Sequence, residues 1–122
     1  MNELPEELRL KDQGRTLVIS YAGGQFFALS AEQLRVESPS AEVKGHGPGQ
    51  EVTVAGKRNV RIGRLEPVGN YAVRIVFDDG HSTGLYTWSY LRELGEERDA
   101  RWSGYLARLA AQGLAREAKG QK

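Results

Sequence analysis

The residues best suited to chemistry lie around the second of two histidines, His81. Asp78, Asp79 and Gly80 precede it directly. An Asp-Gly pair between two apolar, alternating runs is a strong signal for a β-hairpin, and a two-residue turn at positions 79 and 80 places Asp78 opposite His81. A carboxylate beside an imidazole favours the protonated ring and fixes its tautomer, so this pair could carry acid–base chemistry or orient a metal ligand. The alternative interpretation is a cross-strand pair that only secures the strand register.

The other histidine, His46, lies in a glycine-rich segment. Its neighbours include Gly45, Gly47 and Gly49. Glycines let the backbone approach a ligand closely, so the segment could bind phosphate. However, it lacks the Gly-Lys-Ser/Thr ending of a phosphate-binding loop and the glycine spacing of a dinucleotide-binding motif. The absence of both patterns favours a simple connector. If it folds over the hairpin, His46 and His81 with Asp78 could hold a divalent metal, iron or zinc, through nitrogen and oxygen ligands.

Other functional classes find less support in the sequence. The chain has 17 Lys+Arg and 16 Asp+Glu, a net charge of +1, and no recognisable nucleic-acid-binding motif, so we expect no nucleic-acid partner. The modest basic cluster consists of Lys44, Lys57, Arg58, Arg61 and Arg64. Serines near the histidines suggest a hydrolase, but no nucleophile elbow is present. The sequence favours a protein that is not an enzyme, and an enzyme acting through Asp78 and His81 stays the alternative.

The composition indicates what kind of chain must position these residues. A chain of 122 residues is long enough for one stable core. The absence of cysteine excludes disulfides, thiolate nucleophiles and cysteine-ligated metal centres. No apolar run is long enough for a membrane span and no targeting segment is evident, so we expect a cytoplasmic protein without a membrane partner.

Hydrophobic periodicity predicts an α+β fold, in which an antiparallel sheet of short strands and hairpins packs with helices on one face as a two-layer sandwich. Gly23 and Gly24 predict an early hairpin, and helices are expected to begin after the capping residues Ser30 and Thr87. Strands are expected near residues 8–10, 15–21, 26–29, 60–66, 71–78 and 81–86, and a last helix over about 99–119. In the late hairpin, Val73 is expected opposite Tyr86.

Several segments together resemble a known family. They are Leu34-Arg35, residues 38–43, residues 45–49, residues 68–73 and residues 77–91, the last including an Asp-Gly-His…Tyr…Trp…Leu pattern. The chain resembles the gamma-butyrobetaine hydroxylase-like N-terminal domain, whose small bacterial stand-alone members have no known function. The likeness spans about residues 8–95, which suggests that residues 1–95 form this domain and residues 96–122 an amphipathic helix with a frayed tail.

The resemblance implies an α+β domain that, in larger hydroxylases, precedes the oxygenase domain, contributes to dimer contacts and carries a structural zinc held by three cysteines and one histidine. The family histidine matches His81, whereas the cysteine positions fall on Ser38, Ser40 and Val43. Hydroxylase activity does not carry over, because the remaining residues cannot form the oxygenase domain. Similar domains are joined to P-loop ATPases with iron–sulfur clusters, an association that suggests iron metabolism.

Our leading hypothesis is a non-catalytic accessory or protein-interaction domain, which binds a protein partner or forms a homodimer. The predicted partner surface spans residues 35–49 and 78–83 and includes Arg35, Ser38, Ser40, Gly45, Gly47, Gly49 and Asp79. The alternative hypothesis is a small iron- or zinc-binding protein that uses His81 with His46 or Asp78. No other cofactor is expected.

Overall fold

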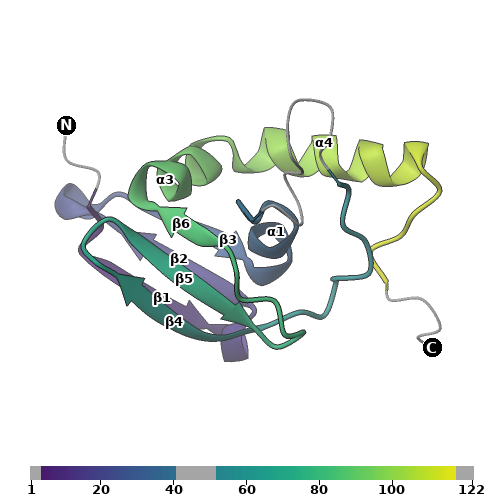
Figure 1. The fold of residues 1–122 in the computed structure, drawn as a ribbon. Helices are drawn as coiled ribbons and strands as arrows, with labels where there is room; N and C mark the ends of the chain where they lie inside the picture. The colour runs from purple at the N-terminus through teal and green to yellow at the C-terminus, as the bar shows by residue number, and fades with distance from the viewer. Residues whose placement is uncertain (1–3, 41–51, 118–122) are drawn as a thin grey trace.

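A computed structural model describes residues 4–40 and 52–117 of the chain. The fold is α+β, as predicted, and its strands form two antiparallel three-stranded sheets (Figure 1). The first sheet has the order β1 (Glu7–Lys11), β2 (Thr16–Ser20) and β3 (Phe26–Ser30). The second has the order β4 (Ile62–Val68), β5 (Ala72–Phe77) and β6 (Leu85–Thr87). The helices α1 (Ala31–Val36), α3 (Trp88–Glu96) and α4 (Arg98–Ala111) lie on one side of the sheets.

Alternation and glycine turns form the first sheet. Leu17, Ile19 and Tyr21 are buried on one face, as their spacing predicts. The expected hairpin between β2 and β3 is confirmed, and both Gly23 and Gly24 have the positive φ angles that favour glycine. The turn between β1 and β2 also needs glycine at position 14, where φ is +89° and a Cβ atom would lie 2.4 Å from a backbone carbonyl oxygen of β4.

The hairpin between β5 and β6 confirms the predicted register at Val73 and Tyr86 but not at its turn. The N–H of Gly80 donates to the Phe77 carbonyl (3.1 Å), and the Phe77 N–H donates to the His81 carbonyl (2.9 Å). The loop therefore has three residues and ends on Gly80, whose φ is +93°. The expected opposition of Asp78 and His81 is wrong, because the extra loop residue places His81 opposite Phe77 and so changes the face that the His81 side chain occupies.

The helices begin where the sequence indicates. In α1 (Ala31–Val36) the Ser30 side chain accepts from the Gln33 N–H, and in α3 (Trp88–Glu96) the Thr87 side chain accepts from the Tyr90 N–H. The last helix, α4 (Arg98–Ala111), is shorter than expected. It ends before Gly113, whose positive φ of +67° is typical of a residue just past a helix C-terminus.

One hydrophobic core joins the two sheets to α1 and α3. It includes Leu17, Ile19, Leu29, Leu34, Val73, Ile75, Phe77, Tyr86, Leu91 and Leu94, all nearly inaccessible to solvent. Tyr105 and Leu109 of α4 form a second cluster with Val36 of α1. As a result every residue of α1 is buried, although three of its six side chains are polar or charged. No helix within residues 4–40 and 52–117 is long and apolar enough to cross a membrane.

Candidate functional site

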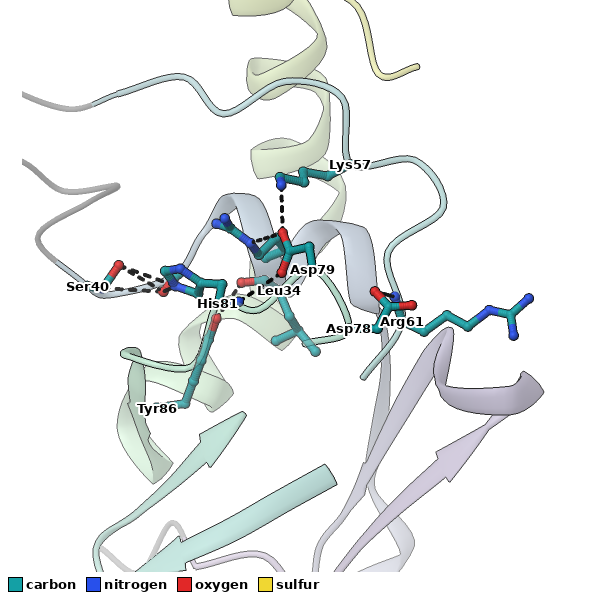
Figure 2. Close-up of polar contacts among 10 residues, drawn as sticks. Leu34, Ser40, Lys57, Arg61, Asp78, Asp79, His81 and Tyr86 are labelled. Carbon is teal, nitrogen blue, oxygen red and sulfur yellow. Dashed lines mark hydrogen bonds and ion pairs between the residues drawn. The ribbon is translucent and has the colours of Figure 1, made fainter. Parts of the chain in front are cut away.

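The site is a buried polar cluster around His81. The imidazole Nε2 lies 2.9 Å from the Ser38 Oγ and 3.4 Å from the Ser40 Oγ, and the two hydroxyl oxygens are 3.3 Å apart (Figure 2). Ser38 is 0% exposed and His81 is 8% exposed. The buried Phe77 ring lies near the imidazole in a tilted arrangement, with 6.1 Å between ring centroids. The cluster thus joins the segment that follows α1 to the turn that follows β5.

A glycine makes room for this contact. A Cβ atom at Gly84 would lie 2.4 Å from the Ser38 Oγ, 3.2 Å from Pro39 and 3.3 Å from the Tyr86 ring. Real Cβ contacts are essentially never closer than 3.0 Å, so a larger residue at position 84 would displace the serine. Gly84 is therefore required for the close approach of two chain segments and not for its backbone angles.

Asp79 fixes the turn that carries His81. One carboxylate oxygen accepts the backbone N–H of His81 (3.1 Å), and the other accepts from Arg35 Nε (2.9 Å) and Lys57 Nζ (2.6 Å). Partial burial acts to raise the pKa of Asp79, but the hydrogen bonds from Lys57, the His81 backbone and Arg35 outweigh it and lower the pKa to about 2. The carboxylate is therefore charged at neutral pH, and it ties three chain segments together.

Two tyrosines hold the end of α1 against this turn. The Tyr86 hydroxyl donates to the Leu34 carbonyl (2.5 Å) and the Tyr90 hydroxyl donates to the Glu37 carbonyl (2.6 Å). These carbonyls lie at the helix C-terminus, where no further turn of helix supplies a donor. Burial raises the pKa of Tyr86 well above its ordinary value, so its hydroxyl stays a donor. The position of Ser38 directly after α1 is set by these bonds.

The structure brings some of the predicted site residues together and separates others. Arg35, Ser38, Ser40 and Asp79 all lie around His81, whereas Asp78 does not. The Asp78 carboxylate accepts the backbone N–H of Arg61 (3.0 Å) and lies apart from the imidazole in Figure 2. The glycine-rich segment with Gly45, His46, Gly47 and Gly49 lies outside the described residues.

The chemistry available to this cluster is limited by burial. A serine hydroxyl at 2.9 Å from an imidazole nitrogen has the geometry of a nucleophile with its base. However, Ser38 is completely inaccessible to solvent, so a substrate has no route to its oxygen in this structure. The hydrogen bonds satisfy buried polar groups, which is the role that buried serines and histidines ordinarily have.

A zinc site of the kind that the resemblance implies does not fit these residues. Two of the related cysteine positions, Ser38 and Ser40, do converge on His81, and the third, Val43, lies outside the described residues. Neutral hydroxyls are poor substitutes for thiolates, and zinc is held by thiolate, imidazole or carboxylate groups. Within the part of the chain that the structure describes, no group of three His, Cys, Asp or Glu side chains could hold a metal ion.

The residues that sequence reasoning missed are those whose role depends on distant partners. Lys57 was expected in a basic cluster, but it forms an ion pair with Asp79. Nothing in the sequence around Gly84 indicates its contact with Ser38. The one available signal for the serines was the family resemblance, which relates Ser38 and Ser40 to ligands that share a site with the family histidine.

Comparisons with known proteins agree with this fold. The family model "Gamma-butyrobetaine hydroxylase-like, N-terminal" matches residues 8–92. Two protein structures determined by NMR in solution are 44% and 50% identical to the chain, with TM-scores of 0.82 and 0.79. Each covers 97% of this chain, which in turn covers 93% and 90% of theirs.

A third similar structure is a crystal structure of a protein of unknown function from Acidithiobacillus ferrooxidans, assigned to the DUF971 family. It is 39% identical, with a TM-score of 0.62, and the match covers 76% of this chain and 93% of that one. No curated protein matches the chain.

Proposed function

The chain belongs to the gamma-butyrobetaine hydroxylase-like N-terminal family, and we propose that it is a non-catalytic accessory domain that binds a protein partner beside the His81 turn. The observation that carries this proposal is the burial of the chemically capable groups. Ser38 and His81 bond to each other inside the protein, so they serve to hold the corner together and are not offered to a substrate. The neighbouring exposed residues are then the ones available to a partner.

The surface beside the turn consists of the exposed residues Asp78, Gly80 and Thr83. Asp78 and Gly80 lie on the three-residue loop that the bonds of Asp79 hold in place, and Thr83 follows His81 two positions after it. A loop held in one conformation loses little conformational entropy when it binds, which favours affinity and specificity. Loops positioned by a rigid scaffold are the usual carriers of binding function.

This proposal refines the partner surface predicted from the sequence. Arg35, Ser38 and Ser40 are buried, so their contribution is to support the surface and not to contact the partner. A link to iron or iron–sulfur metabolism is part of the proposal only by association, through the larger proteins in which similar domains occur. We propose no metal chemistry, since the described residues do not fit a metal site.

The test compares two matched substitutions. Thr83→Arg adds a bulky charge to the proposed surface, and Ser103→Arg makes the same change at an exposed position on α4. Proteins captured from the native cell after chemical cross-linking are quantified by mass spectrometry. We expect Thr83→Arg to reduce a specific partner at least about tenfold, a loss of about 1.4 kcal/mol, while Ser103→Arg retains it.

Self-association is measured in parallel by sedimentation velocity over a range of concentrations. If the partner is a second copy, Thr83→Arg shifts the protein to monomer and Ser103→Arg does not. Retention of every specific partner and of the wild-type sedimentation behaviour by Thr83→Arg would refute the proposed surface.

A further inference from the structure

A second polar site lies at the N-terminal turn of α1 and contains a buried carboxylate. Glu32 lies in the first turn of α1, and its side chain is only 6% exposed. It accepts two hydrogen bonds from the guanidinium of Arg116, 2.9 Å from Nε to Oε2 and 2.7 Å from Nη2 to Oε1. The same guanidinium lies 5.1 Å from the centroid of the Trp102 ring. The carboxylate and the ring together surround one planar cation.

The cation comes from the segment that follows α4, outside the helices and strands. Arg116 follows the end of α4 at Ala111 and belongs to no helix or strand. Two backbone bonds tie its segment to the chain before β4, from the Gly56 N–H to the Ala115 carbonyl (2.9 Å) and from the Arg58 N–H to the Arg116 carbonyl (3.0 Å). An exposed ion pair between Arg58 and Glu117 is the third tie. Segments with few ties and exposed hydrogen bonds open at lower free-energy cost than core elements.

A cavity of about 430 Å³ adjoins this ion pair. Its lining includes Glu32, Trp102 and Arg116, together with Ala28 and Ser30 of β3. β3 is an edge strand of the first sheet, so one side of its backbone faces away from β2. Arg98 Nη1 already donates to the Ala28 carbonyl at this edge (3.1 Å), so the cavity gives a side chain, and not a pairing strand, access to the buried carboxylate.

We propose that Glu32 and Trp102 form a binding site for an arginine side chain of a protein partner, and that Arg116 occupies this site while the partner is absent. A buried carboxylate left without a cation is strongly unfavourable, so the site requires a positive charge in both states. The bidentate hydrogen bond with Glu32 and the stacking on the Trp102 ring favour a guanidinium over an ammonium group. A lysine side chain has neither the planar shape nor the paired donors that this geometry needs. The Thr83 surface is not needed for this inference.

Because Arg116 occupies the site, it must lower the affinity of the site for the arginine of a partner. A short flexible connection gives an intramolecular ligand an effective concentration of roughly millimolar or more, so the wild-type protein should bind an arginine peptide at least about tenfold more weakly than a variant without Arg116. The substitution Arg116→Ala removes this competitor and leaves Glu32 and Trp102 unchanged.

The probe is the capped tripeptide acetyl-Gly-Arg-Gly-amide, titrated against wild type, Arg116→Ala and the double variant Glu32→Gln/Arg116→Ala. Binding is measured by NMR from the Trp102 indole signal, with Trp88 as the internal reference. We expect the single variant to bind at least tenfold more tightly than wild type and the double variant to lose this gain. The lysine and glutamine tripeptides should bind at least tenfold more weakly than the arginine one, and free L-arginine should bind no better than the peptide.

Equal binding by the single and double variants, or no binding by a folded Arg116→Ala protein, would overturn the proposal. Tighter binding of free L-arginine than of the peptide would overturn the assignment to a protein partner. If Arg116→Ala does not fold, the test is made on the wild-type protein. Excess arginine peptide must then shift the backbone amide signals of residues 114–117 toward unstructured values. Unchanged signals would refute the replacement of Arg116 by the peptide arginine. Neither result depends on whether Thr83→Arg loses a partner, so this inference and the proposed function can fail separately.

Discussion

The substitution Gly84→Ala tests whether the contact between Ser38 and His81 organises this corner of the protein. The new Cβ atom would lie 2.4 Å from the Ser38 Oγ, so the serine has to move, and its 2.9 Å bond to the His81 Nε2 is lost or lengthened. Overpacking of a close-packed site costs about 1–3 kcal/mol. The lost hydrogen bond adds about 1 kcal/mol, so we expect a total destabilisation of about 2–4 kcal/mol.

The assay is urea unfolding followed by circular dichroism, with Gly63→Ala as the matched control. Gly63 is exposed and a Cβ atom there would lie 3.4 Å from its nearest neighbour, an ordinary contact. Its φ angle is also acceptable for alanine, so the control should change the free energy of unfolding by less than about 0.5 kcal/mol. Nitrogen chemical shifts of the His81 ring report whether its Nε2 has lost a partner.

A second variant separates the clash from other effects of alanine at position 84. Ser38→Ala removes the hydroxyl that obstructs the new methyl group, so the double variant should be less destabilised than the sum of the two single variants by about 1 kcal/mol or more. A Gly84→Ala protein with wild-type unfolding midpoint and unchanged His81 ring shifts would refute this reasoning. Strictly additive single variants would show that the contact with Ser38 is not the cause.

Three further predictions follow from the same structure. Because the pKa of Asp79 is lowered from 3.8 to about 2, its charge should stabilise the protein above pH 3.8, and this contribution should be lost as the pH falls through about 2. The full shift corresponds to about 2.4 kcal/mol, which solvent screening reduces to about 1 kcal/mol. The difference in unfolding free energy between wild type and Asp79→Asn should therefore shrink steadily as the pH falls from 3.8 toward 2, and a difference that does not shrink would contradict it. Gly14→Ala combines a positive φ of +89° with a contact of 2.4 Å to the Ile62 carbonyl oxygen, so it should destabilise by more than about 2 kcal/mol in thermal unfolding; a melting temperature within a degree of wild type would disprove it. Treatment with a strong chelator should leave the melting temperature unchanged, and elemental analysis of untagged protein should find less than one zinc or iron per ten chains, because no group of three His, Cys, Asp or Glu side chains among the described residues could hold a metal ion. Stoichiometric metal would reverse this conclusion.

Much of the fold could be predicted from the sequence because its signals are local. The capping residues Ser30 and Thr87 begin helices through bonds to a residue three positions away. The turn at Gly23 and Gly24 and the opposition of Val73 and Tyr86 follow from turn chemistry and alternation within one hairpin. The family resemblance also depends on the sequence alone, and the match over residues 8–92 confirms it.

The length of the turn after β5 could not be predicted from local sequence. An Asp-Gly pair is compatible with a two-residue or a three-residue loop, and the difference decides whether His81 faces solvent with Asp78 or the core with Phe77. Three donors converge on Asp79 and hold the longer loop. Two of them, Arg35 and Lys57, come from segments 44 and 22 positions away, so no window of sequence around the turn contains the deciding interactions.

The sequence by itself therefore determined the α+β class, the helix starts, the buried faces of the strands and the family. Only the tertiary structure decided which polar groups meet: His81 with Ser38, and Glu32 with Arg116, 84 positions along the chain. Such pairs form because folding removes these groups from water, and each must then bond to whichever partner the packing of distant elements brings within reach.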